Sequence, residues 1–368
     1  MLFRSTGGAA AGNSDQCYTT PTWKTTGNPD YITYDQTGTY LDVPQTDHYT
    51  FVGWFTAPVG GTKIADNTGK VLIANAFAQN NTQLYAHWSP MYSGTYVYDE
   101  ASLGKIGTSG TYHIVKDISL STTWTPKDSF SGTIDGHGHT ISDLAIKYES
   151  NSTHYGEAVE NYGFIRELKG TIQNLNFKRV AVSVSKYKDG INNSNVGVIA
   201  GVLNGGTLRN ITLTEVNLTV DHYREVSASG AYVNTRAGGF VGHMSSGMIE
   251  NCSIGGTSSI WSKAGRATDS ADAQCFAGGI VGYLTGGTIT GCSRADTVSV
   301  TSRSRVDGKN SASRSAAGGI VGVRDAGTVS SCTSTVTNVS GTWDHASGAD
   351  YSKNYSWKQS GAIVGRGA

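Results

Sequence analysis

The chain has few charged residues and no excess of either sign. Of its 368 residues, 28 are Lys or Arg and 28 are Asp or Glu, so charged residues make up 15% of the sequence. So balanced a charge provides no field that would recruit nucleic acid or an anionic membrane. No segment approaches the roughly 20 apolar residues of a membrane helix, and neither a signal peptide nor a C-terminal anchor is visible. We therefore expect no nucleic-acid partner and no membrane insertion.

Proline and cysteine are also scarce, whereas glycine is abundant. Six prolines beside 48 glycines exclude collagen, and Tyr, Trp, Val, Ile and Thr are too frequent for a disordered chain. The five cysteines have the spacing of neither a zinc site nor a small disulfide framework, so we expect no metal and no cofactor. Long stretches of Ala, Glu, Lys and Leu are absent. These absences predict an all-β protein with few helices.

Two short patterns recur in the same order through most of the chain. The first, Gly-x-apolar-apolar-Gly, begins at Gly197, Gly238, Gly278, Gly318 and Gly361, which are 41, 40, 40 and 43 residues apart. The second, Thr-Ile-x-Asn-(Leu/Cys), begins at positions 140, 171, 207, 248, 288 and 328 and weakens toward the C-terminus. Each repeat is interpreted as one coil of three short strands. The pattern predicts a right-handed parallel β-helix of about six coils over 110–368, with an incomplete last repeat.

The second pattern also predicts which residues form the corners of the coil and which face its interior. Its fourth position holds residues that tolerate a left-handed backbone, as a sharp corner needs: Asp143, Asn174, Asn210, Asn251, Gly291 and Ser331. Its fifth position is Leu or Ile in the early coils and cysteine in the late ones. We therefore expect Cys252, Cys292 and Cys332 to be buried, unreactive thiols. Cys17 and Cys275 have no assignment.

The rest of each repeat is predicted to be a loop on one side of the solenoid. These loops fall at 147–161, 185–195, 221–236, 261–275, 302–316 and 343–360. They contain ten aromatic residues: Tyr148, Tyr155, Tyr187, Tyr223, Tyr232, Trp261, Trp343, Tyr351, Tyr355 and Trp357. Two interpretations stay open. The aromatics either form local cores between loops, or they form a contact face for a glycan or a protein.

The repeats resemble the GLUG-motif β-helical repeats of bacterial surface proteins. The best match is Gly278-Gly-Ile-Val-Gly282 followed by Gly287-Thr-Ile-Thr-Gly-Cys292, and the resemblance covers about 110–368. It implies a β-helix in a surface protein. Similar repeats occur in adhesins and beside IgA-cleaving metallopeptidase modules, but the chain has no His-Glu-x-x-His zinc motif.

A separate module precedes the repeats. Phe51-Val-Gly-Trp-Phe-Thr56 and Leu84-Tyr-Ala-His-Trp88 resemble the internalin B-type, or Listeria–Bacteroides, repeat over about 30–89. That resemblance implies a small β-grasp-like domain with Trp54 and Trp88 in its core. Residues 1–29 have no assignment. Residues 90–109 are interpreted as a linker whose possible short helix covers the first coil.

Parallel β-helices also include enzymes that degrade polysaccharides, so we weighed this alternative. Asp135, His137 and His139 form the most suggestive cluster, but Asp135 has no acidic partner on the equivalent stretches of the next coils. Its sequence, Asp-Gly-His-Gly, is also typical of a tight turn. We therefore expect no catalytic residues and no enzymatic activity.

The function favoured by the sequence is that of a bacterial extracellular protein, secreted or on the cell surface. It is expected to act like an adhesin, with a glycan, a host or neighbouring-cell protein, or copies of itself as partner. A subunit of a self-assembling filament or surface layer is an alternative. An ice-binding role is disfavoured because the threonines are expected to fall out of register between coils.

Overall fold

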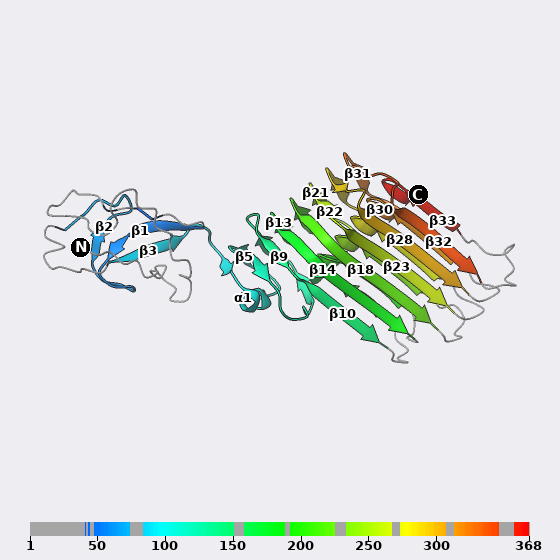
Figure 1. The fold of residues 1–368 in the computed structure, drawn as a ribbon, viewed down its shortest axis with the longest axis horizontal. Coiled ribbons are helices and arrows are strands. Elements are labelled where there is room, and N and C mark those ends of the chain that lie inside the picture. Colours follow the sequence, from blue (N-terminus) through cyan, green and yellow to red (C-terminus); the bar gives the residue numbers. More distant parts are fainter. Residues whose placement is uncertain are drawn as a thin grey trace. The chain divides into compact units, whose positions relative to one another are not determined.

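The computed structural model describes residues 41, 43–44, 48–73, 84–150, 158–187, 192–224, 233–266, 273–306, 313–345 and 357–367. The chain divides into two compact units, Met1–Ser93 and Gly94–Ala368 (Figure 1). The division falls inside the stretch 90–109 that the sequence assigned to a linker. Each unit is described by itself below.

The first unit contains a three-stranded antiparallel sheet in the order β2-β1-β3, formed by Lys63–Ala65, Tyr49–Phe55 and Tyr85–Pro90. Trp54 and Trp88 are 3% and 2% exposed, and both pack edge-on against Phe51. The prediction that the two tryptophans belong to the core is confirmed. The β-grasp-like fold of this module stays a prediction.

The second unit begins with a cap. Strand β4 (Thr95–Val97) pairs in parallel with β5 (Thr111–Ile114), and the short helix α1 (Glu100–Gly104) lies between them in the chain. The Asp99 carboxylate accepts a hydrogen bond from the Ser102 amide, which completes the N-terminal cap of the helix. Leu103 is buried in the apolar core of the solenoid. A short helix is therefore present in the predicted stretch, and its role as a cover of the first coil stays a prediction.

Two of the four parallel sheets of the solenoid consist of short strands. The eight-stranded sheet contains β4 and β5 and continues with β8 (Thr133–Asp135), β13 (Thr171–Gln173), β17 (Thr207–Arg209), β21 (Met248–Glu250), β26 (Thr288–Thr290) and β31 (Thr328–Ser330). The seven-stranded sheet contains β7 (Lys127–Phe130), β12 (Ile165–Leu168), β16 (Ala200–Leu203), β20 (Val241–Met244), β25 (Val281–Leu284), β30 (Val321–Arg324) and β34 (Val364–Gly367).

The other two sheets contain several longer strands, which extend beyond the two sheets of short strands. The ten-stranded sheet contains β6 (Ile118–Ser119), β9 (Thr140–Ser142), β10 (Ala145–Ser150), β14 (Asn176–Tyr187), β18 (Thr212–Arg224), β22 (Ser253–Gly255), β23 (Ser258–Arg266), β27 (Ser293–Arg294), β28 (Val298–Val306) and β32 (Val339–His345). The six-stranded sheet contains β11 (Ala158–Tyr162), β15 (Asn192–Gly197), β19 (Val233–Gly238), β24 (Ala273–Gly278), β29 (Ser313–Gly318) and β33 (Trp357–Gly361).

The predicted all-β parallel solenoid is thus confirmed, with two corrections. The solenoid has about five turns instead of six, and each turn adds a strand to four sheets instead of three. The right-handed sense of the coil stays a prediction.

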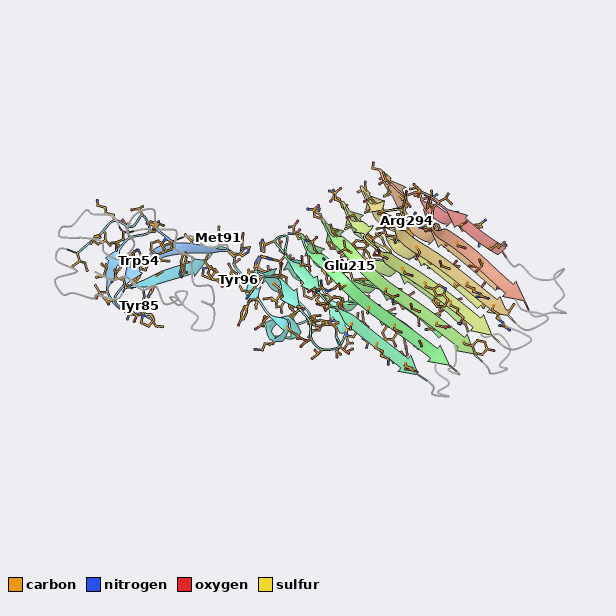
Figure 2. All side chains as sticks on the ribbon, viewed as in Figure 1. Trp54, Tyr85, Met91, Tyr96, Glu215 and Arg294 are labelled. Atoms are coloured by element: carbon orange, nitrogen blue, oxygen red, sulfur yellow. The ribbon has the colours of Figure 1, made fainter. Side chains whose placement is uncertain are left out.

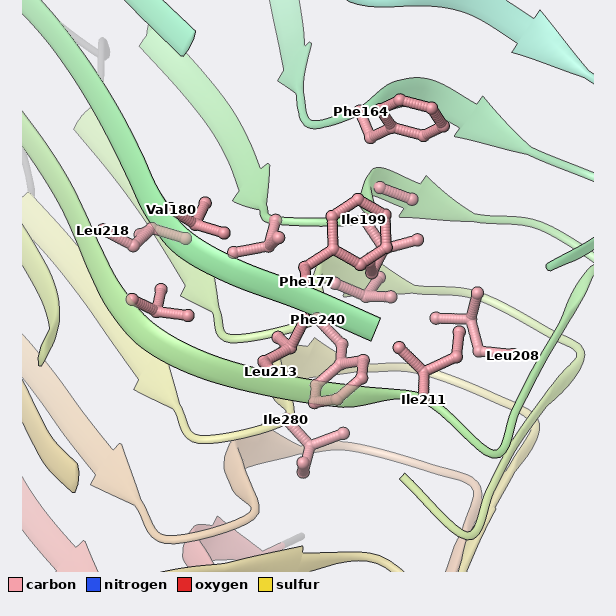
Figure 3. Packing of buried hydrophobic residues seen from close by; sticks show 14 of the residues in the cluster. Phe164, Phe177, Val180, Ile199, Leu208, Ile211, Leu213, Leu218, Phe240 and Ile280 are labelled. Atoms are coloured by element: carbon pink, nitrogen blue, oxygen red, sulfur yellow. The ribbon is translucent and has the colours of Figure 1, made fainter. Parts of the chain in front are cut away.

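The inner faces of the sheets enclose a continuous apolar core. The residue after each repeat's Gly-x pair, such as Ile199, Phe240 or Ile280, points into this core, as does Phe164 in an earlier coil (Figure 3). The glycine that opens the repeat is required by close packing. A Cβ atom on Gly278 would lie 1.9 Å from the carbonyl oxygen of Val281. Neighbouring strands approach each other so closely at this position that only glycine fits there. Each coil therefore keeps the same cross-section.

Five of the six predicted corner residues share one corner of the solenoid, but Asp143 does not: strand β9 pairs with β14, which places Asp143 in register with Arg179 at a different corner. All six corner positions have positive φ angles, between 51° and 64°: Asp143, Asn174, Asn210, Asn251, Gly291 and Ser331. The position after the corner is confirmed as interior. Cys252 and Cys292 are buried in the row of Leu175 and Ile211, and Cys332 packs at the edge of the same core. Leu144 is also buried, but it is in register with Val180 and not with this row, which corrects the sequence alignment of the first copy.

The cysteines in this row have the environment of inert thiols. Contact with the Cys252 thiol, together with burial, raises the pKa of Cys292 to about 12. The pKa of Cys332 is raised as well, by its contact with Cys292 and by burial. Because the thiolate is the reactive form, a raised pKa disfavours reaction at both side chains, and their inertness stays a prediction. Cys275, which the sequence left unassigned, is buried in a separate small cluster with Val233, Ala264, Ala273 and Val306.

One interior position of the solenoid holds an arginine. Arg294 is in register with Ile254 of the preceding coil, and it is buried (Figure 2). Its guanidinium donates to the Ser334 hydroxyl and to backbone carbonyls of 295, 298, 335 and 337. Burial lowers its pKa. These bonds compensate the buried charge and attach the backbone at 335–337 to the core.

The described ends of the six predicted loops are strands, which corrects the sequence interpretation there. Strands β10, β14, β18, β23, β28 and β32 extend into the loops on one side, and the strands of the six-stranded sheet extend into them on the other. The inner faces of these extensions pack on each other: the hydroxyls of Ser302 and Ser315 lie 2.6 Å apart, as do those of Ser304 and Ser313. Alternating serines in a strand do not produce the apolar period by which a buried strand is recognised.

The threonines of the eight-stranded sheet are also in register, contrary to expectation. Thr133, Thr171 and Thr207 pair directly, and Thr288 pairs with Thr328 after an interruption at Met248. The number of residues between these threonines varies along the chain, which obscures the alignment in the sequence. The adjacent column contains charged pairs, such as Arg209 with Glu250 at 2.8 Å, so the sheet face is not a regular threonine array.

Candidate binding surfaces

The ten predicted loop aromatics do not form one face. Tyr155, Tyr232, Tyr351 and Tyr355 lie outside the described residues. Tyr187, Trp343 and Trp357 belong to strands β14, β32 and β33 instead of loops. The other three, Tyr148, Tyr223 and Trp261, are strand residues whose surroundings the structure describes.

Tyr148 is a packing residue and not part of a contact face. Its ring lies 5.0 Å from that of Tyr162 and packs against the apolar core. Beside it, the Lys186 ammonium is 2% exposed and forms an ion pair with Glu160 at 2.6 Å. Tyr162 also donates a hydrogen bond to Glu160, and burial together with that bond raises the pKa of Tyr162. For this tyrosine the local-core interpretation holds.

Trp261 and Tyr223 lie on the outer face of the ten-stranded sheet. The inner face of these strands is identified by Val300, Ser302 and Ser304, which are buried, so the residues between them face outward. Register then places a set of neighbouring outward residues together, here named the Trp261 patch: Asp221, Tyr223, Trp261, Lys263, Arg303 and Arg305.

Contacts within the Trp261 patch fix the positions of the Lys263 ammonium and of the two aromatic rings. The Lys263 ammonium binds the Asp221 carboxylate at 2.8 Å and lies 5.9 Å from the centre of the Trp261 ring. Tyr223 covers Gly265 of the next coil, where a Cβ atom would lie 2.8 Å from the ring. Trp261 and Tyr223 remain half-buried. A half-exposed tryptophan beside ordered cations is a typical anchor for a binding partner.

A second outward cluster was missed by the sequence analysis. It lies where the six-stranded and seven-stranded sheets meet and centres on Tyr283. The guanidinium of Arg236 is 4.5 Å from the centre of the Tyr283 ring, and the ring of His243 stacks at 5.2 Å. The Tyr283 hydroxyl donates to Asp325. Burial and this bond raise the pKa of Tyr283 to about 12, and burial beside Arg236 lowers that of His243 to about 4.

A sequence signal for this cluster existed. His243 and Tyr283 follow directly after the last glycine of the first pattern, in the position held by Val202 and Val323 in other coils. Because the pattern alternates inward and outward residues, this position had to face outward. The signal was overlooked because the predicted loops contained more aromatic residues.

The cluster around Asp135 forms a structural turn. His137 has a φ of 48°, and the Asp135 carboxylate accepts hydrogen bonds from the His137 amide, Gln173 and Asn174. Burial opposes ionisation of Asp135, but these bonds outweigh it and lower its pKa. His137 also lies 2.9 Å from a ring nitrogen of His113. Within the described residues, no three His, Cys, Asp or Glu side chains are grouped as metal ligands.

Comparisons with known proteins give one sequence match and one structural match. No family model matches the chain, so the GLUG-type and internalin B-type resemblances stay predictions. The chain is 35% identical over 89 residues to halomucin of Haloquadratum walsbyi, which covers 24% of the chain and 1% of halomucin. It is thus similar to a very small part of that protein. Among the described helices, none is long and apolar enough to span a bilayer.

The structural match is a crystal structure at 1.30 Å of "a putative immunoglobulin A1 protease" from Bacteroides ovatus. The match covers 73% of this chain and 83% of that one, with a TM-score of 0.42 and 20% identity. We expected a chain without enzymatic activity, and this finding contradicts that exclusion because the matching chain is described as a protease. No site residue is carried over from it.

Proposed function

We propose that the chain is an extracellular or surface protein of the adhesin type, which binds a glycan or a protein with the Trp261 patch. The match to halomucin supports the location. The observation that carries the binding role is the arrangement of Trp261 and Tyr223, which project on one sheet face beside Lys263, Arg303 and Arg305. The strands beneath are paired on both sides, so this face is rigid before a partner binds.

The chemistry of the patch suits both partner classes. A tryptophan ring offers a large apolar face that stacks on sugar rings or fills a pocket in a protein. Lysine and arginine beside it supply hydrogen bonds of defined direction to hydroxyl, carboxylate or carbonyl groups. Because Lys263 is already oriented by Asp221 and Trp261, its side chain loses little entropy on binding.

A glycan array and a panel of immobilised extracellular-matrix proteins provide the test. Trp261→Ala should weaken binding at least tenfold, while the melting temperature changes little because the side chain is only half-buried. The matched control is Tyr148→Ala, which removes an aromatic ring that packs inside. It should lower the melting temperature and leave the affinity of the remaining folded protein unchanged.

Three results would contradict the proposal. These are the absence of binding to both panels, equal binding by the wild type and Trp261→Ala, and lost stability as the sole effect of Trp261→Ala. Concentration-dependent polymers in electron micrographs would favour the filament alternative instead.

A further inference from the structure

A row of short hydroxyl side chains runs along the outer face of the ten-stranded sheet, with Trp261 in its middle. Strands β14, β18, β23, β28 and β32 lie side by side there (Figure 1). Register aligns one outward position on all five strands, here named the Trp261 column: Ser183, Thr219, Trp261, Thr301 and Ser340. On each strand the residue before this position is buried, so the column residue faces outward.

The outward position two residues earlier is polar and uncharged as well. Asn217, Ser259 and Ser299 occupy it on the three middle strands and are in register. Within the described part of the chain, these side chains and the four hydroxyls of the Trp261 column form no hydrogen bond with other protein groups. The outer face of the eight-stranded sheet differs, because several polar side chains there bind each other, such as Gln173 and Asp135 at 2.7 Å. The face around the column therefore presents donors and acceptors that a ligand can use.

The charged side chains beside the Trp261 column have partners within the chain. The Asp221 carboxylate binds the Lys263 ammonium at 2.8 Å. Arg305 is in register with Asp344, and both Arg303 and Arg305 interact with other groups of the chain. The column itself contains no ionisable side chain. Because the neighbouring charges are of both signs and already engaged, the face suits an uncharged ligand better than a polyanion.

We propose that the ligand of the Trp261 patch is an uncharged linear polysaccharide that lies along the Trp261 column, parallel to the solenoid axis. This ligand class rests on the proposed function and makes it specific. Neighbouring strands are about 4.8 Å apart, which is close to the length of one sugar unit in an extended polysaccharide, so each coil faces one sugar. Trp261 stacks on one pyranose ring, and the hydroxyls of Thr219 and Thr301 hydrogen-bond to the sugars on either side.

The test uses the full chain and oligosaccharides of two to six sugars derived from cellulose, chitin, mannan and xylan, with oligomers of alginate and polygalacturonate as the acidic comparison. We expect at least one uncharged series to bind in calorimetric titrations. Its affinity should rise about tenfold or more between two and five sugars, because each added sugar reaches another strand of the column. Its dissociation constant should change little with salt, because no charge on the ligand is screened.

Substitutions in the column test the contacts on either side of the tryptophan. Thr219→Val and Thr301→Val remove one hydroxyl each and keep a β-branched side chain that suits a strand. Each should weaken binding of the six-sugar oligomer about threefold or more, because it loses one hydrogen bond to the ligand. Trp261→Ala should weaken binding of every length.

The matched control is Thr207→Val, which removes the same hydroxyl from the outer face of the eight-stranded sheet and should leave binding unchanged. Circular dichroism and the melting temperature ensure that only folded variants are compared. The polysaccharide proposal is overturned if no uncharged series binds, if the acidic oligomers bind more tightly, or if two sugars bind as tightly as six. It is also overturned if Thr207→Val weakens binding as much as Thr301→Val.

The proposed function fails in a different way, namely if Trp261→Ala leaves the binding of every partner unchanged. Binding of an extracellular-matrix protein that depends on Trp261 but not on Thr219 or Thr301 would keep the proposed function and reject the polysaccharide.

Discussion

The solenoid has two interiors that are built from different residues. One is the apolar core, where Phe164, Ile199, Phe240 and Ile280 point toward each other in successive coils (Figure 3). The other is the seam between the long strands of the ten-stranded sheet and those of the six-stranded sheet. It contains Lys186, His222, Ser302 and Ser315, all buried. The core depends on burial of apolar surface, whereas the seam depends on hydrogen bonds and an ion pair.

The difference has a consequence for stability along each coil. The free energy gained from apolar burial is proportional to the apolar area removed from water, and a polar atom buried there without a partner is destabilising. A seam of serines contributes less stabilising free energy per residue, because each of its hydrogen bonds replaces one that the unfolded chain makes with water. The core should therefore determine whether the coil folds, and the seam should open first when the protein is destabilised.

Substitution in the core should have the largest effect. Phe240→Ala removes a fully buried ring and should reduce the free energy of unfolding by about 3–5 kcal/mol, measured by chemical denaturation. The counterpart in the seam is Ser302→Ala, which removes one hydroxyl and should reduce it by about 1 kcal/mol. Equal losses for the two variants would mean that the two interiors are energetically alike.

A pH titration separates the interiors further. His222 is fully buried in the seam, neither ring nitrogen has a hydrogen-bond partner, and burial together with the nearby Lys186 charge lowers its pKa to about 3. The unfolded chain has a histidine pKa near 6.5, so it binds the proton first as the pH falls. The stability present above pH 6.5 is lost progressively toward pH 3, by about 2 kcal/mol at pH 5 for this residue alone.

His222→Leu removes this titration and leaves no unpaired ring nitrogen in the seam. We expect the variant to be at least as stable as the wild type at pH 7.5 and to retain more of that stability at pH 5. Denaturation curves at the two pH values measure the difference. If the variant loses as much stability on acidification as the wild type, His222 is not the residue that titrates.

The smallest effect is expected at a corner, which belongs to neither interior. Asn251 has a φ of 52°, and Asn251→Ala should reduce the free energy of unfolding by about 1 kcal/mol because alanine is strained in this region. Asn251→Gly is the control and should change stability little, as Gly291 occupies the same position one coil later. A loss for glycine as large as that for alanine would indicate a side-chain contact as the cause, not backbone strain.

The parts of the fold that the sequence predicts are those with a strict local requirement. Asn174 and Asn251 were identified as corners because few residue types accept a left-handed backbone. Cys292 was placed in the core because it shares a position with leucine or isoleucine in earlier coils. In each case one position and one physical rule were sufficient.

The parts that were predicted wrongly depend on partners far away in the chain. Ser302 and Ser315 are polar, yet they are buried because each is the other's hydrogen-bond partner across two sheets. Tyr148 and Trp261 are both aromatic residues of predicted loops, but they belong to strands, and only register decides that one faces inward and the other outward. Tyr283 differs, because the alternation of the first pattern already places it outward.

The glycines that open each repeat have a further consequence for how such a chain can change during evolution. A Cβ atom on Gly278 or Gly318 would collide with a backbone oxygen at 1.9 or 1.8 Å, so single substitutions there are strongly disfavoured. Duplication or loss of one complete repeat avoids any such collision, because it adds or removes a whole layer with the same outline. Recombination between repeats is then the natural way to lengthen the protein, because each added repeat extends every sheet by one strand.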